Sequence, residues 1–252
     1  MDKLNLLILG EQKCGTHSLK MCLNQHSKID MIVKELHIFD NPPQRALKKV
    51  NIVINERIER KKENQNLKIG AKYLGEGTPL YLYNKQSVPN SLRYNKDMKY
   101  IVVLRNPYER AFSAHNMLTN KNIEKRPFEI AIKEDFQQLD EKIPRNFKNA
   151  RSHYLRRGMY VDQLKELYKE VDSKNIHVVL CDNLWKNPND ELKKIFNFLE
   201  IQYEPLQFKH ANKGNYKDKT IHPLADGILH HIYRQKNREL ETFLGIPIPW
   251  DK

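Results

Sequence analysis

A stretch near the N-terminus combines two glycines, a lysine and several side chains that can donate hydrogen bonds to an anion. It runs Gly10-Glu11-Gln12-Lys13-Cys14-Gly15-Thr16-His17-Ser18, and its glycines have the G-x-x-x-x-G spacing of a phosphate-binding loop. Glycine lets a backbone approach a ligand closely, and the amides that begin a following helix favour an anion. The stretch therefore predicts an anion-binding turn, although glycine-containing turns of this kind also occur as purely structural features.

The loop departs from the nucleotide-kinase pattern in an informative way. In that pattern Lys-[Ser/Thr] directly follows the second glycine and holds the β- and γ-phosphates and Mg²⁺. Here Thr16 and His17 follow Gly15, and the lysine of the loop is Lys13, inside it. The residues therefore predict an anion site that is not built for a triphosphate with magnesium.

A second candidate anion site follows the apolar run Tyr100–Leu104. Arg105 comes directly after that run, and Ser113 lies further along a helix that Pro107 is placed to begin. The guanidinium fork of arginine suits a phosphate group. Alternatively, Arg105 pairs with a carboxylate and Ser113 lies on the surface, and the residues alone leave both interpretations open.

Short apolar runs alternate with amphipathic segments along the chain. Buried strands are predicted at Leu4–Leu9, Tyr100–Leu104 and Ile176–Cys181, and helices at Thr16–Gln25, Pro107–Leu118, Leu155–Val171, Pro188–Leu199 and Ile228–Leu244. This alternation predicts an α/β fold with a mostly parallel sheet whose ligands bind at the carboxyl ends of the strands. Residues 41–66 and 119–150 fit the pattern poorly; we expect peripheral segments there, around a substrate cleft or as plain solvated faces.

Composition narrows the class of protein. The chain has 252 residues, 44 of them Lys or Arg against 31 Asp or Glu, and its net charge of +13 favours anionic partners. With 39% hydrophobic and 30% charged residues, it suits neither a disordered chain nor a membrane protein. We expect no signal peptide from the N-terminal residues, because their apolar run is short and is soon broken by Gly10 and Glu11. The three cysteines (Cys14, Cys22 and Cys181) predict no disulfide framework and no metal site, and they favour the cytoplasm.

Together the two loops resemble the sulfotransferase family that uses 3′-phosphoadenylyl sulfate (PAPS), most closely the heparan sulfate glucosaminyl sulfotransferases and their bacterial relatives. The first loop resembles the 5′-phosphosulfate loop of that family, and Tyr100–Asn116 resembles its 3′-phosphate motif. Further segments match in the same order: Lys34–Asp40, Gly75–Tyr81, Gly158–Tyr160 and Lys213–Pro223. The resemblance implies one sulfotransferase domain over residues 1–252, with a P-loop-like three-layer α/β/α fold.

The resemblance also implies a role for each matching residue. Lys13 would contact the bridging oxygen of the 5′-phosphosulfate, Glu35 would be the catalytic base, and His37 would share that role or support it. The other cofactor-binding residues would be Cys14, Gly15, Thr16, His17 and Ser18 around the phosphosulfate, Arg105 and Ser113 at the 3′-phosphate, and His210, Lys217 and Lys219 in a C-terminal phosphate loop whose register is open by one residue.

Three positions depart from the family pattern. His17 stands where the family usually has Arg, Gly77 stands where eukaryotic members often carry Lys, and the cysteine pair near the C-terminal loop is missing. The first two departures affect which acceptor is expected more than which cofactor is expected. The third agrees with a cytoplasmic, bacterial-type enzyme.

The implied reaction moves a sulfuryl group from PAPS to a hydroxyl or amine of an acceptor and leaves 3′-phosphoadenosine 5′-phosphate (PAP), without a metal. The resemblance points to a glycan acceptor, with other small molecules open, and to no nucleic-acid or integral-membrane partner. Two alternatives remain: a P-loop-type kinase of a small metabolite, which Mg²⁺-dependent ATP turnover would favour, and a basic nucleic-acid-binding module, although no sequence signature of one is apparent.

Overall fold

The protein is built around a parallel β-sheet. A computed structural model describes residues 3–63, 68, 70–146, 149–151, 153–209 and 220–250. Within these residues the sheet has five strands in the order β2-β3-β1-β4-β5, and every pairing is parallel. The strands are β1 (Leu6–Gly10), β2 (Ile29–Ile32), β3 (Tyr73–Glu76), β4 (Lys99–Leu104) and β5 (Ile176–Leu180).

The central strands are apolar because helices cover both faces of the sheet. All residues of β1 are buried, and so are Tyr100–Leu104 of β4. Parallel strands that are buried on both faces read as continuous apolar runs instead of alternating ones. This is why LLILG and YIVVL were recognisable as strands from sequence.

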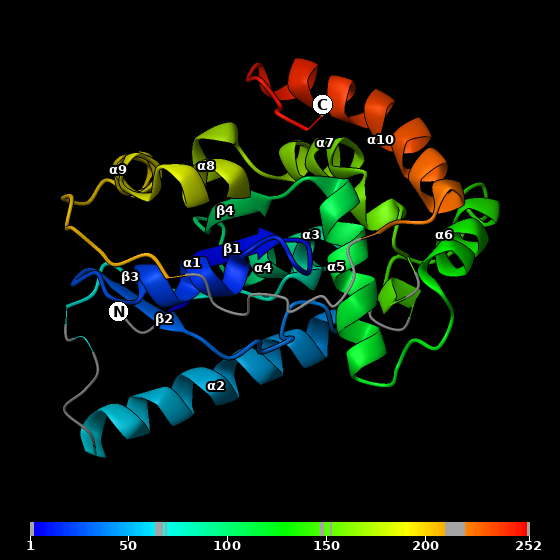
Figure 1. Cartoon of the computed structure of the whole chain (residues 1–252). Helices are drawn as coiled ribbons and strands as arrows, with labels where there is room; N and C mark the ends of the chain where they lie inside the picture. Colours follow the sequence, from blue (N-terminus) through cyan, green and yellow to red (C-terminus); the bar gives the residue numbers. More distant parts are fainter. Residues whose placement is uncertain are drawn as a thin grey trace.

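Helices connect the strands and form the outer layers (Figure 1). Helix α2 lies along one side of the sheet and α10 lies across the opposite side. The longer helices are α1 (Thr16–Leu23), α2 (Pro43–Glu63), α4 (Ser87–Tyr94), α5 (Pro107–Asn120), α6 (Phe128–Gln137), α7 (Tyr160–Glu170), α9 (Pro188–Phe198) and α10 (Pro223–Leu244). Shorter ones are α3 (Leu80–Tyr83), α8 (Cys181–Lys186) and the 3₁₀ turns Asn149–Arg151, Arg156–Gly158 and Ser173–Asn175.

The strand order reverses between β1 and β4. The chain leaves β1 toward β2 on one side, whereas β4 leads to β5 on the other. Loops that depart in opposite directions open a crevice at the carboxyl ends of the two strands, which is where ligands bind in open α/β sheets. Both predicted anion loops follow these two strands, after Gly10 and after Leu104.

The predicted three-layer α/β/α fold is confirmed, but two helix boundaries were wrong. The helix expected over Leu155–Val171 is a 3₁₀ turn followed by α7, because Met159 takes a non-helical conformation between them. The last helix begins at Pro223 instead of Ile228, since the His222 side chain caps it by accepting a hydrogen bond from the amide of Leu224. Terminal differences of one or two residues at the other elements are ordinary fraying.

The two segments expected to be peripheral carry helices. Residues 41–66 contain α2, and residues 119–150 contain the end of α5, all of α6 and a 3₁₀ turn; residues 64–66 and 147–148 lie outside the described residues. Helix α6 packs with α5 and α10 in a second apolar cluster that includes Tyr154 and Leu155. The sheet has its own, larger cluster. That residues 41–66 and 119–150 border a substrate cleft, and that the chain forms a single domain, stay predictions.

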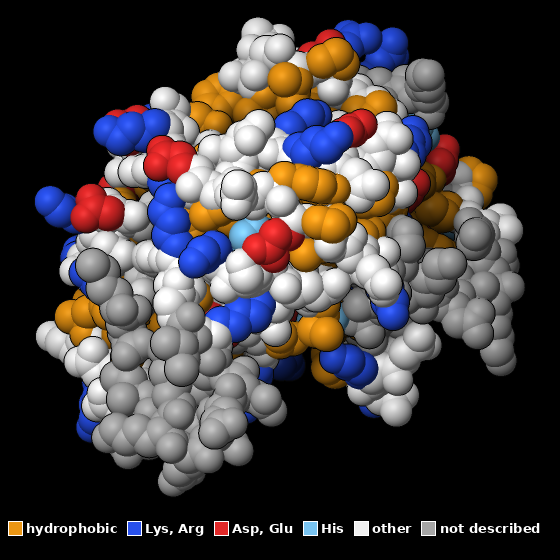
Figure 2. Space-filling model, turned by 90° about the vertical axis from the view of Figure 1, so that its left-hand side faces the viewer, with side chains coloured by type: hydrophobic (Ala, Val, Ile, Leu, Met, Phe, Trp, Pro, Cys, Tyr) orange, Lys and Arg blue, Asp and Glu red, His pale blue; other side chains and the backbone are white. Residues whose placement is uncertain are grey.

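The charge of the chain is dispersed on the face seen in Figure 2. Lys and Arg side chains there alternate with Asp, Glu and apolar side chains and do not gather into one basic patch. None of the helices in the described ranges is both long enough and apolar enough to cross a membrane.

Candidate active site at the carboxyl ends of the strands

The first anion loop owes its shape to left-handed backbone conformations. Gly10, Lys13 and Gly15 have φ angles of 140°, 76° and 92°. A Cβ atom on Gly10 would lie 2.4 Å from the carbonyl oxygen of Val103, so only glycine fits where the loop leaves the sheet. Residues with positive φ turn successive amides toward one concave side, and α1 then begins at Thr16. The loop is therefore arranged to bind an anion with its backbone.

Cations converge on this loop. Burial lowers the pKa of Lys13, and the nearby charges of Arg105 and Lys121 lower it further. The Lys13 ammonium therefore lies in a region of positive potential, where an anion would relieve the repulsion among the cations. Lys121, at the end of α5, had not been singled out from sequence.

The buried members of the loop contribute through the backbone more than through their side chains. Cys14 is fully buried, its thiol lies 3.6 Å from the Tyr160 hydroxyl, and burial raises the pKa of that thiol. Thr16 and Ser18 are each only 4% exposed. His17 is half-buried beside them in the first turn of α1. Cys14 is thus a structural thiol and not a reactive one.

Arg105 connects the second loop to the first. Its Nη1 atom donates to the carbonyl oxygen of Lys13 at 3.3 Å, and its guanidinium lies 5.1 Å from the ring centre of Trp185. The Tyr160 hydroxyl donates to the carbonyl oxygen of Arg105 at 2.8 Å. The two loops are therefore adjacent, as a ligand with an anionic group at each end requires.

Arg105 also forms the ion pair that sequence reasoning had left open. Its Nη2 atom lies 2.7 Å from Oε2 of Glu109, one turn further along the chain in α5. The Glu109 side chain is 52% exposed, whereas that of Arg105 is 17% exposed. The pair is thus at the solvent edge of the site, and a bound anion would compete with Glu109 for the guanidinium.

The remaining predicted cofactor residues differ in how far the structure places them. Ser113 lies on α5, about two turns into the helix, and is 2% exposed. His210, Lys217 and Lys219 lie outside the described residues.

Three side chains after β2 form a short chain of acid–base groups. The His37 Nδ1 atom lies 2.6 Å from Oδ2 of Asp40, and its Nε2 atom lies 3.8 Å from Oε2 of Glu35. The pKa of His37 is raised, chiefly by its hydrogen bond to Asp40. The segment is not extended at His37, whose φ is 49°, yet Glu35 and His37 are brought together as expected. The sequence marks Asp40 only as the last residue of the segment Lys34–Asp40.

A cavity of about 150 Å³ opens beside these acid–base groups. Glu35 and His37 line it together with Gln12 of the first loop and Lys121 at the end of α5. Leu80 and Met117 form part of an apolar wall, so the cavity has both charged and apolar sides. It joins the first loop to the acid–base groups.

The first loop is also anchored from below by a buried ion pair. Glu11 is fully buried and accepts a hydrogen bond from Nε of Arg157, which also lines the cavity. Sequence gave no signal for this pair, because the two residues are far apart in the chain and the loop motif that contains Glu11 does not specify a partner for it.

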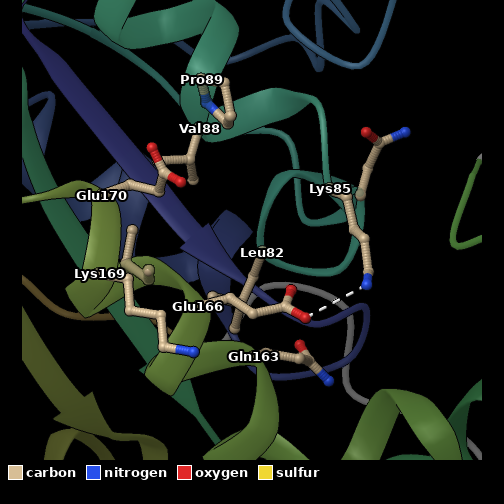
Figure 3. Close-up of a pocket in the computed structure, with 10 residues that line it drawn as sticks. Leu82, Lys85, Val88, Pro89, Gln163, Glu166, Lys169 and Glu170 are labelled. Atoms are coloured by element: carbon tan, nitrogen blue, oxygen red, sulfur yellow. Dashed lines mark ion pairs between the residues drawn. The ribbon is translucent and has the colours of Figure 1, made fainter.

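A second pocket lies away from the predicted residues (Figure 3). It has a volume of about 200 Å³ and is formed by α3, α4, the residues between them and α7. Lys85 and Glu166 point toward one another there, with 3.4 Å between the ammonium and the carboxylate. Glu166 also pairs with Arg145, so this pocket is bordered by an ion-pair network.

No cluster of three or more His, Cys, Asp or Glu side chains placed to hold a metal ion occurs among the residues that the structure describes.

Known proteins with similar sequences are sulfotransferases. The profile of the sulfotransferase domain family matches residues 3–242. Heparan sulfate glucosamine 3-O-sulfotransferase 5 of Mus musculus is 23% identical over 218 residues, which are 83% of this chain and 58% of that relative. The chain therefore spans little more than half the length of that relative.

Solved structures share the fold. A sulfotransferase from Alicyclobacillus acidocaldarius superposes with a TM-score of 0.76 at 21% identity over 99% of both chains. The mouse sulfotransferase SULT7A1 complexed with PAP gives a TM-score of 0.50 at 14% identity, over 94% of this chain and 66% of that one. With a family profile that matches nearly the whole length, the chain belongs to the sulfotransferase family.

Proposed function

We propose that this protein transfers a sulfuryl group from PAPS to a hydroxyl or amine of an acceptor, and that the acceptor is a glycan. The observation that carries the proposal is the contact between the two anion loops, in which Arg105 donates to the carbonyl oxygen of Lys13 at the switch point of the sheet. A molecule with a 5′-phosphosulfate and a 3′-phosphate needs two anion sites this close. Family membership and the neighbour complexed with PAP support the same cofactor.

The cofactor would lie across both loops. The backbone of Cys14 and Gly15 and the first turn of α1, from Thr16 through His17 to Ser18, would surround the phosphosulfate. Arg105 and Ser113 would hold the 3′-phosphate, with the guanidinium exchanging Glu109 for the phosphate. His210, Lys217 and Lys219 are proposed on the family resemblance as further phosphate contacts.

The chemistry follows from the positions of Lys13 and Glu35. The acceptor oxygen or nitrogen attacks sulfur in line, the new bond to sulfur forms as the bond from sulfur to the bridging oxygen breaks, and PAP leaves. Lys13 and the loop amides stabilise the charge that develops on the bridging oxygen. Glu35 takes the acceptor proton. His37, held by Asp40 and facing Glu35, stabilises the resulting arrangement or shares the proton.

The glycan assignment rests on the cavity and on the relatives. Charged groups such as Lys121 and Arg157 line the cavity beside Glu35, which suits an acceptor that carries anionic groups. The curated relative is described as acting on heparan sulfate glucosamine.

We also place the enzyme in the cytoplasm, because its three cysteines are free thiols, as a reducing compartment would keep them.

Thermal-shift measurements test the cofactor. PAP should raise the melting temperature in the absence of Mg²⁺, while ATP and NAD should not; a ligand at 100 times its Kd stabilises a protein by about 2.7 kcal/mol. Release of PAP from PAPS should then be measured with N-sulfated heparosan oligosaccharides and with p-nitrophenol as acceptors. Stabilisation by Mg·ATP alone would support the kinase alternative, and salt-sensitive binding of mixed nucleic acid without PAP binding would support the nucleic-acid alternative.

A further inference from the structure

A buried lysine links the cofactor loop to the segment that carries the proposed base. Lys20 lies on α1, one turn after the first loop, and is 0% exposed. Its ammonium donates to the carbonyl oxygen of Val33 at 2.9 Å and to that of Gly77 at 2.6 Å. A buried ammonium is costly to desolvate unless it is hydrogen-bonded, and burial lowers its pKa here. An apolar side chain at position 20 would cover the sheet equally well, so packing alone does not explain the buried ammonium of Lys20.

The two carbonyls that Lys20 holds belong to the loops after β2 and β3. Val33 precedes Glu35 by two residues, and Gly77 directly follows Glu76 at the end of β3. The far end of the same segment is held by hydroxyl groups: Thr78 accepts a hydrogen bond from the amide of His37 at 3.3 Å, and Tyr81 accepts one from that of Ile38 at 2.8 Å. Lys20 therefore holds the Val33 end of the segment Val33–Ile38 by a hydrogen bond.

The carboxylates beside Lys20 complete the arrangement. Glu76 is fully buried and interacts electrostatically with Lys20, as does Glu35. Glu76 also accepts hydrogen bonds from Thr78 and Tyr81, the residues that hold the far end of the segment. Lys20 thus bonds directly to the Val33 end of the segment Val33–Ile38. Glu76 acts on the other end through Thr78 and Tyr81, which bond to His37 and Ile38.

The environment of Gly77 shows that Lys20 occupies a place that another side chain would need. A Cβ atom on Gly77 would lie 2.8 Å from Cδ of Lys20 and 3.0 Å from Cβ of Ile8. A side chain at 77 would therefore displace the stem of Lys20. At Gly77, where the family pattern often has a lysine, the ammonium of Lys20 reaches the backbone carbonyl from α1.

We propose that Lys20 is a positioning residue that fixes Glu35 relative to the cofactor loop, by tying the backbone at Val33 and Gly77 to α1. This rests on the proposed function, because it takes Glu35 as the base. The first turn of α1 holds the donor, and the next turn holds the segment that deprotonates the acceptor. One rigid helix thereby sets the distance between the two reactants.

Lys20→Met tests this role, since it keeps most of the stem and removes the ammonium. We expect kcat for the N-sulfated heparosan acceptor to fall at least tenfold, while KM for PAPS and the PAP-induced shift in melting temperature stay within twofold and within one degree of the wild-type values. Lys28→Met, which alters an exposed lysine before β2, is the control and should behave as wild type. A lysine that merely stabilised the fold would lower PAP binding and kcat together, or neither.

Two further variants keep the proposal testable if Lys20→Met folds poorly. Gly77→Ala leaves the charge in place but pushes its stem, and should lower kcat several-fold with PAP binding unchanged. The double variant Lys20→Ala/Gly77→Lys removes the stem that a side chain at 77 would meet and returns an ammonium from that position, so it should recover part of the kcat lost in Lys20→Ala. Wild-type kcat in Lys20→Met or in Gly77→Ala would overturn the role of Lys20. Absence of PAP binding and turnover in the wild-type protein would instead overturn the proposed function.

Discussion

The donor side and the acceptor side of the site are built in different ways. On the donor side the backbone makes the site: Gly10, Lys13 and Gly15 adopt positive φ angles, and Cys14 and Thr16 are buried beneath the loop. On the acceptor side, side chains make it: Lys20, Thr78, Tyr81 and Asp40 hold a segment that is otherwise irregular. A backbone site tolerates changes of side chain, whereas a site held by side chains depends on each of them.

The two sides also differ in charge. Lys13, Arg105 and Lys121 lie around the first loop, and burial together with the charges of Arg105 and Lys121 lowers the pKa of Lys13. On the acceptor side Glu35, Asp40 and Glu76 are acidic, with His37 and Lys20 between them. The donor side thus carries the positive charge that binds an anion. The acceptor side carries the carboxylates that can take a proton from the acceptor.

The largest effect should come from the acceptor side. Glu35→Gln keeps the shape of the side chain and removes its basicity, so turnover should fall by about 10² to 10⁴. PAP binding, measured by calorimetry, should be unchanged because the donor loops are intact. Glu56→Gln, an exposed change on α2, is the control. Near-normal turnover in Glu35→Gln would remove this residue from the mechanism and leave His37 as the base.

Lys13→Ala probes the donor side. Loss of the ammonium at the bridging oxygen should lower kcat by roughly 10² to 10³, as expected when a preorganised donor to developing charge is removed. The loop should keep its shape, since it is formed by the backbone, and steady-state kinetics should show a smaller change in KM for PAPS than in kcat. A change confined to KM would make Lys13 a binding residue only. Lys28→Ala serves as the matched control.

The same contrast explains what could be predicted from sequence. Glycine spacing and apolar strands are local signals, and they were sufficient to predict the parallel sheet and to place both loops at its carboxyl edge. The nearness of Glu35 to His37 was also predictable, because the two are neighbours in the chain.

Contacts between distant segments left no local signal. Lys20 reads as a surface lysine on a short amphipathic helix, and its buried position depends on Gly77, far along the chain. Trp185, against which Arg105 lies, follows a strand by several residues and matches no motif. The acceptor side, which side chains assemble, was therefore the less predictable half of the site.

The pH dependence of stability tests the buried support of the acceptor side. Burial raises the pKa of Glu76 to about 7 from 4.5. The folded protein therefore binds this proton more tightly than the unfolded chain does, so the stabilisation is complete below pH 4.5 and is lost as the pH rises toward 7. Urea unfolding should show that wild type loses about 3 kcal/mol more than Glu76→Gln between pH 4.5 and pH 8. Parallel stability curves would show that Glu76 is not titrating there.

The smallest effect should come from Glu109, the exposed partner of Arg105. An ion pair at the surface contributes about 0.2–1 kcal/mol, so freeing Arg105 in Glu109→Gln should strengthen PAP binding by up to about fivefold. The same change removes an acid from the first turn of α5, where negative charge favours the helix, and should lower the free energy of unfolding slightly. Tighter binding with lower stability, from calorimetry and urea unfolding on one sample, is the signature of a side chain that competes with the ligand. Weaker PAP binding would instead show that Glu109 holds Arg105 in its binding orientation, and the donor side would then depend on a side chain after all.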